Sequence, residues 1–147
     1  MRRPGRSLAR GPGRVLVAVY AVFALSSCAR AGLQVLTRLD EAPVAYLLSA
    51  LAAGVYVVAT VALLRDARRL ALPAVAFELA GVLGVGTWSL LDPARFPDQT
   101  VWSAFGAGYA YVPLVLPVLG LVWLRATGAG PGPRARRRPR RPGRMQP

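Results

Sequence analysis

Four long apolar runs, separated by short polar stretches, dominate the pattern of hydrophobic and polar positions. The runs cover residues 15–36, 43–64, 70–91 and 102–124. Each is close to the ~20 residues that an α-helix needs to cross ~30 Å of hydrocarbon. Because the connections are short, consecutive helices must pack antiparallel. The pattern predicts an all-α membrane protein, an antiparallel up-down bundle of four transmembrane helices.

Arginine is distributed unevenly over the segments that flank these runs. Of the 19 arginines, 16 lie in the N-terminal tail, in the loop at 65–69 and in the segment 125–144. The two other loops hold two arginines and four acidic residues. Cytoplasmic loops carry such an excess of positive charge, so both termini are predicted to be cytoplasmic. Trp88 and Trp102 are expected at the outer membrane boundary and Trp123 at the inner one, where tryptophan is enriched.

Three regions follow from this organisation. They are a basic N-terminal tail (1–14), a transmembrane domain (15–127) and a C-terminal tail (128–147) made mostly of Arg, Pro and Gly. The last composition offers nothing to build a core, so we expect that tail to be disordered and to lie on anionic lipid. Arginine-rich segments also bind nucleic acid. Orientation and surface anchoring already account for these arginines, so a nucleic-acid partner is disfavoured.

Composition narrows the class of protein further. The chain has no histidine and one cysteine, which excludes imidazole catalysis, a multi-cysteine metal site and an intrachain disulfide. The sequence also contains no nucleophile–base pair, phosphate-binding loop or cofactor motif. We therefore expect no enzyme activity, no cofactor and no bound metal. The abundance of Ala, Gly, Pro and Arg is typical of a GC-rich bacterial genome, which favours a bacterial plasma membrane as the location.

Glu78 lies inside the third apolar run, and an intramembrane charge is a candidate functional residue by default. At 1.5 Å per residue it lies about 10 Å from the cytoplasmic boundary, at the depth expected of Tyr20 and Tyr56. Gly81 follows one turn later on the same face, so Glu78 is expected to point into the bundle. Two interpretations result. Glu78 is either a proton- or cation-binding carboxylate, or a neutral glutamic acid that holds helices together through hydrogen bonds.

Arg30 lies in the outer half of the first run, about 24 Å from the cytoplasmic boundary. Because arginine stays charged, its side chain must pair, stack or extend to the interface. Gln34 lies one turn away on the same polar stripe. Tyr46, Tyr109 and Asp92 are expected near Arg30. The two interpretations are a structural contact with Asp92 or a tyrosine, and an outward-facing site for an anion or lipid headgroup.

Small residues and prolines indicate how the helices pack. Ala76, Ala80 and Gly84 recur at four-residue spacing in the third run. Such spacing marks helix interfaces, either within the chain or in a homodimer. Pro113 and Pro117 lie inside the fourth run, where each is expected to kink the helix. The bend is either fixed or a hinge.

The stretch Leu25-Ser26-Ser27-Cys28 resembles a bacterial lipobox, in which the cysteine is lipidated after an upstream signal is removed. Apolar helical character continues beyond Cys28 to Leu39, and three more runs follow. Both features disfavour lipidation. Cys28 is instead expected to be a small packing residue.

The order of features over roughly 15–125 is similar to that of small four-span integral membrane proteins of actinobacteria without an assigned function. The resemblance is carried by residues 39–43, 77–82, 106–109 and 112–117. It implies the same fold and brings no catalytic or binding residues. We expect an accessory or structural subunit that binds another membrane protein or lipid. The alternative is a small transporter or channel component that uses Glu78 or Arg30.

Overall fold

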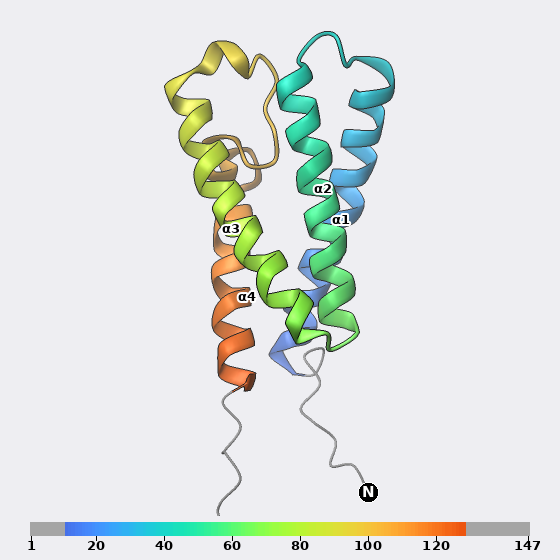
Figure 1. Cartoon of the computed structure of the whole chain (residues 1–147), viewed down its shortest axis with the longest axis vertical. Helices are drawn as coiled ribbons and strands as arrows, with labels where there is room; N and C mark the ends of the chain where they lie inside the picture. Colours follow the sequence, from blue (N-terminus) through green and yellow to red (C-terminus); the bar gives the residue numbers. More distant parts are fainter. Residues whose placement is uncertain (1–10, 129–147) are drawn as a thin grey trace, which may run out of the picture.

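The computed structural model describes residues 11–128. Its elements are α1 (Pro12–Thr37), α2 (Pro43–Leu64), α3 (Arg68–Leu91), η1 (Pro93–Arg95), η2 (Ser103–Tyr109) and α4 (Val112–Gly128), where η marks a 3-10 helix. The α-helices run alternately up and down, which confirms the predicted all-α, up-down fold (Figure 1). Predictions for residues 1–10 and 129–147, including lipid contact by the arginine-rich tails, lie outside the described residues.

Three of the helices are long and apolar enough to cross a membrane: α1 with 26 residues, α2 with 22 and α3 with 24. At 1.5 Å per residue they are about 33–39 Å long, enough for a hydrocarbon core of ~30 Å. Large apolar side chains are exposed on the outward faces of all four α-helices. Soluble monomers avoid apolar surface of that extent. The chain is therefore an integral, multi-pass membrane protein.

Helices α1 and α2 form the most extensive pair, and alanines of α2 make much of the core. The fully buried ones are Ala45, Ala52, Ala59 and Ala62. Lipid gives helices no hydrophobic reason to associate, so small side chains that let backbones approach are the means of packing. The predicted stripe on α3 behaves differently, because Ala76, Ala80 and Gly84 are all exposed. That stripe faces outward instead of packing within the chain.

Charged residues separate to the two ends of the bundle. The start of α1, the α2–α3 turn and the end of α4 lie together at one end (Figure 1), which we call the basic end. Its described charges are Arg14, Arg65, Arg68, Arg69, Arg125 and the acidic Asp66. The opposite end, called the acidic end, carries Arg38, Asp40, Glu41, Asp92, Arg95 and Asp98.

The fourth passage through the bundle is broken, whereas the sequence predicted one continuous span at 102–124. Arg68, which begins α3, donates from Nη1 to Thr127 Oγ1 near the end of α4 at 3.2 Å, so α4 returns to the basic end. Helix α4 has only 17 residues, about 25 Å. The rest of the passage is an irregular segment, 96–111, in which η2 lies at 102° to α4.

Left-handed backbone conformations interrupt the predicted helix before its prolines. Positive φ angles occur at Ala104, Phe105, Gly106, Ala110 and Tyr111. Such angles are incompatible with a right-handed α-helix. Gly106 is also required sterically, because a Cβ at that position would lie 2.7 Å from the ring of a proline at the start of α4. The positive φ angle and the close approach of the proline ring together explain why residue 106 is a glycine.

Pro113 therefore acts differently from the prediction. Pro113 is the second residue of α4, where a missing backbone N–H removes no helical hydrogen bond, so it helps to begin the helix. Pro117 lies inside α4. The predicted bend precedes Pro113 and is a break in the helix, not a kink within it.

Candidate functional site

Glu78 lies at the centre of the bundle and is fully buried. The hydroxyl of Tyr20 on α1 donates a hydrogen bond to Glu78 Oε2 at 2.7 Å. Tyr56 on α2 faces the same carboxyl group, with its ring centroid 6.3 Å from that of Tyr20. The structure thus brings three of the candidate residues together from three helices. With Trp102 they form what we call the glutamate cluster.

Trp102 joins the glutamate cluster from the irregular segment. It is 1% exposed, and its indole ring packs so closely on Gly81 that a Cβ there would lie 2.6 Å from Trp102 Cζ3. The indole N–H faces the hydroxyl of Tyr56. The predicted position of Trp102 at the membrane boundary is therefore wrong. Because the fourth passage is not a continuous helix, residue number does not measure depth along it.

Three polar atoms of the glutamate cluster lack a hydrogen-bond partner among the described residues. They are Glu78 Oε1, Tyr56 Oη and Trp102 Nε1. The Tyr56 hydroxyl faces both other groups, but neither approach has the geometry of a hydrogen bond. An unpaired buried polar group costs about 1–3 kcal/mol. A carboxyl, a hydroxyl and an N–H in this arrangement can hold a proton or a small hydrogen-bonding molecule, while the N–H donor disfavours a metal cation.

A turn stabilised by side chains presents Trp102 to the cluster. Thr100 Oγ1 accepts hydrogen bonds from the backbone N–H groups of Trp102 at 3.1 Å and Ser103 at 3.0 Å. Ser103 Oγ in turn accepts from the N–H of Thr100 at 2.9 Å. On α3, Ser89 Oγ accepts from the N–H of Ala104 at 2.9 Å. These bonds satisfy backbone donors that a broken helix would otherwise leave unpaired inside a membrane.

Arg30 connects α1 to the irregular segment, nearer to the acidic end. Its Nη1 donates to Tyr109 Oη at 2.6 Å, and its Nη2 donates to the backbone carbonyl oxygen of Gln99 at 2.9 Å. A tyrosine is thus the partner of Arg30, as one interpretation of the sequence had it. Asp92 makes no contact with Arg30 in the described structure; its carboxylate lies 2.8 Å from Arg95 Nε. Both guanidinium contacts hold the broken fourth passage against α1.

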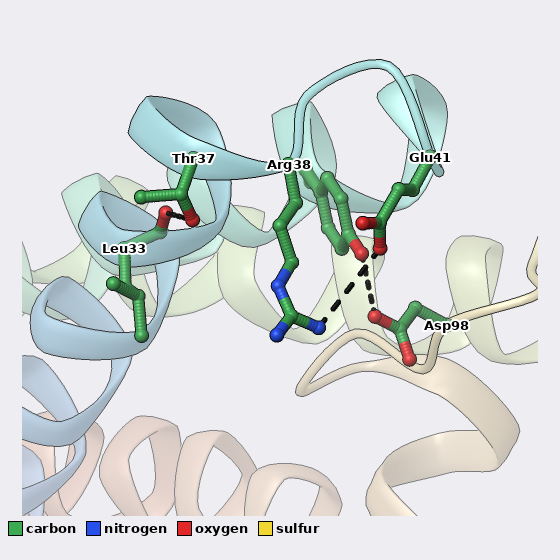
Figure 2. A network of polar contacts seen from close by, with 6 residues as sticks. Leu33, Thr37, Arg38, Glu41 and Asp98 are labelled. Atoms are coloured by element: carbon green, nitrogen blue, oxygen red, sulfur yellow. Dashed lines mark hydrogen bonds and ion pairs between the residues drawn. The ribbon is translucent and has the colours of Figure 1, made fainter.

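The acidic end carries a network that sequence reasoning did not single out. Figure 2 shows Asp98 beside Arg38 and Glu41. The hydroxyl of Tyr46 donates to Asp98 Oδ2 at 2.6 Å, and Arg38 Nη1 lies 3.9 Å from Glu41 Oε2. Tyr46, expected near Arg30, is therefore bonded to a loop carboxylate instead. This network attaches the start of α2 to the loop that follows η1.

Two remaining candidates stand apart from these groups. Gln34 is buried, and its side-chain oxygen has no hydrogen-bond partner within residues 11–128. Cys28 is exposed on α1, so it does not pack in the core as expected. The helix continues unbroken from Cys28 to Thr37.

An apolar groove lies between α1 and α4 in the half of the bundle nearer the basic end. Its volume is about 340 Å³, and its walls include Val15 and Val19 of α1 and Leu119 and Trp123 of α4. Helix α4 packs mainly against α3 and hardly touches α1, so the bundle is not closed here. Sequence reasoning did not single out the groove, although its α4 wall lies in a stretch predicted to be helical.

No protein-family model, curated protein or solved structure matches the chain. The class of protein therefore rests on the fold. Helix length and hydropathy make it a multi-pass integral membrane protein with three complete spans and a broken fourth passage.

Proposed function

We propose that the protein is a non-enzymatic accessory or structural subunit that binds another membrane protein or a lipid. The groove between α1 and α4 carries this proposal. A four-helix bundle normally closes on itself, and helices in lipid associate through van der Waals packing. The side chains that line the open groove lose this van der Waals packing unless an apolar group fills the groove. An occupant that inserts a chain or a helix between α1 and α4 restores the lost contacts.

In this proposal the protein lies in a bacterial plasma membrane with both termini in the cytoplasm. The five arginines and one acid of the basic end support that orientation, because cytoplasmic loops carry excess positive charge. Eleven further arginines lie in residues 1–10 and 129–147 of the sequence. Two observations support a bacterial source. The abundance of Ala, Gly, Pro and Arg is typical of a GC-rich genome, and the chain resembles small four-span proteins of actinobacteria.

Site-directed photo-crosslinking tests whether the groove has a specific occupant. A photoreactive side chain is placed at Leu119 in the groove, or at Val57 on α2, which does not line the groove; both positions are exposed. They lie at similar depths, about 14 and 11 Å from the basic end. In native membranes the Leu119 position should yield a discrete lipid or protein adduct that Val57 does not. The same adducts in the same yield at both positions would refute the proposal.

A small transporter or channel component is the second candidate, favoured by the broken fourth passage. Transporters often place substrate and ion sites near mid-membrane, beside discontinuous helices. The glutamate cluster lies where the irregular segment meets α3, and its unpartnered atoms are the groups such a site would use. Arg30, the other candidate, donates both its bonds to the irregular segment, which supports a positioning role.

Flux measurements separate the two candidates. Glu78→Gln keeps the size of the side chain and its ability to accept from Tyr20, so the fold should be retained. A transporter should lose proton or cation flux in liposomes with this variant, measured against the wild-type protein. An accessory subunit should show no flux in either, and its groove adducts should be unchanged by Glu78→Gln.

A further inference from the structure

The rim of the α1–α4 groove combines apolar depth with positive charge. Arg14 lines a shallow depression that adjoins the groove, since Val15 and Val19 belong to both. Arg125 lies in the last turn of α4, directly before the groove residue Ala126. Both arginines are exposed, and neither has an ion-pair partner within residues 11–128. At the basic end, one exposed arginine thus lines a depression that adjoins the groove, and a second directly precedes a groove residue in α4.

We propose that this groove binds one anionic glycerophospholipid, with an acyl chain between α1 and α4 and its phosphate within reach of Arg14 and Arg125. The inference rests on the proposed function and names the occupant of the groove. A phospholipid matches both parts of the surface at once, because an apolar chain fills the groove and the anionic headgroup neutralises its rim. Guanidinium groups bind phosphate through paired, charge-assisted hydrogen bonds.

The size of the groove favours an acyl chain over a protein helix. Its volume is about 340 Å³, open along one side to the surroundings. An α-helix is about 10 Å across with its side chains, so it could seat only one ridge of side chains there. A helix would also bring no negative charge to Arg14 and Arg125 unless its own sequence supplied one. Trp123 forms part of the wall near the basic end, a position where indole rings lie at the level of lipid headgroups.

The two arginines should set a preference for anionic over zwitterionic lipid. An arginine at a membrane surface attracts an anionic lipid strongly enough that its removal should lower the preference about fivefold. Arg38 provides a matched control, because it is exposed but lies at the acidic end, beside Glu41. Its removal should leave labelling of the groove unchanged. The prediction is thus a loss of selectivity that depends on position and not on total charge.

The test uses the full chain in nanodiscs that hold equal amounts of phosphatidylglycerol and phosphatidylcholine, with a photoreactive acyl chain on one lipid at a time. Phosphatidylglycerol should label the groove residues of α1 and α4 in clear preference to phosphatidylcholine. Arg14→Gln and Arg125→Gln should each lower that preference about fivefold. Leu119→Trp should fill the groove and abolish its labelling, while lipid labelling at Val57 persists.

Equal labelling of the groove by the two lipids in the wild-type protein would overturn the inference. This measurement uses the wild-type protein alone, so it does not depend on whether any variant folds. An unchanged preference in both arginine variants would overturn it too. A protein adduct at Leu119 in native membranes would also exclude the lipid but leave the accessory function standing. The absence of any groove-specific adduct would refute both the bound lipid and the accessory function. A failure of the lipid proposal alone can therefore be distinguished from a failure of the proposed function.

Discussion

Gly81 provides the sharpest test of whether the irregular segment reaches the middle of the bundle. An alanine Cβ at this position would lie 2.6 Å from Trp102 Cζ3 and 2.7 Å from Cη2, where real contacts are 3.4–4 Å. The indole ring is 1% exposed, so it cannot move away without disturbing the glutamate cluster. Gly81→Ala therefore overpacks the contact between α3 and the irregular segment.

The expected magnitude follows from two opposing effects. Overpacking a closely packed site costs about 1–3 kcal/mol, whereas replacing a helical glycine by alanine gains about 0.5–1 kcal/mol. Gly84 on the same helix is the matched control, because a Cβ there meets nothing within 4 Å. Gly84→Ala should show the helix gain alone. The two variants should then differ by about 1–3 kcal/mol in free energy of unfolding, which isolates the contact with Trp102.

Reversible unfolding in mixed micelles, titrated with a denaturing detergent and followed by circular dichroism, measures this difference. In a Trp102→Leu background the difference between the alanine variants should shrink, since the indole that opposes the Cβ at Gly81 is gone. Equal stabilisation by Gly81→Ala and Gly84→Ala in the wild-type background would refute the placement of the irregular segment.

Four further substitutions test the polar contacts with the same titration. Tyr20→Phe removes the hydroxyl that donates to Glu78, so the free energy of unfolding should fall by about 1–3 kcal/mol; no change would contradict the hydrogen bond. Arg30→Gln and Tyr109→Phe should each destabilise, and their double-mutant cycle should give a coupling of about 0.5–3 kcal/mol, whereas additive effects would argue against the contact. Asp92→Asn breaks only an exposed ion pair and should change stability by at most about 1 kcal/mol.

The three complete spans could be predicted from hydropathy because a bilayer requires a minimum apolar length. The predicted run 43–64 coincides with α2, while α1 and α3 begin three and two residues before the predicted 15 and 70. The extra residues include charged ones, Arg14, Arg68 and Arg69, which a helix can carry at the end of a span. The length of an apolar run therefore shows which residues cross the hydrocarbon, but it does not show where the helix begins outside the hydrocarbon.

The broken fourth passage could not be predicted from hydropathy, which is equally high for a helix and for a buried irregular segment. Its physical causes are local, namely the left-handed residues before Pro113 and the hydroxyls of Thr100 and Ser103 that replace helical hydrogen bonds. The cluster of Gly106, Gly108 and Pro113 in the sequence is a signal that would have suggested a break.

The same distinction explains how much of the glutamate cluster could be predicted. Counting 1.5 Å per residue placed Tyr20, Tyr56 and Glu78 at one depth, and this works because all three lie in unbroken helices. Trp102 was instead expected at the boundary because tryptophan is enriched there, and its burial against Gly81 could not be foreseen without the break in the helix. The groove between α1 and α4 could not be predicted because hydropathy does not show which helices of a bundle pack closely against each other.

We propose that the basic and acidic ends lie on opposite sides of a bacterial plasma membrane, with the basic end inside. Cys28 is the one cysteine of the chain, so Cys28→Ser gives a background for single-cysteine labelling. Glu41→Cys reports on the acidic end and Arg69→Cys on the basic end, and both positions are exposed. A membrane-impermeant maleimide should label Glu41→Cys in intact cells and Arg69→Cys only after permeabilisation. Labelling of Arg69→Cys in intact cells would contradict the account.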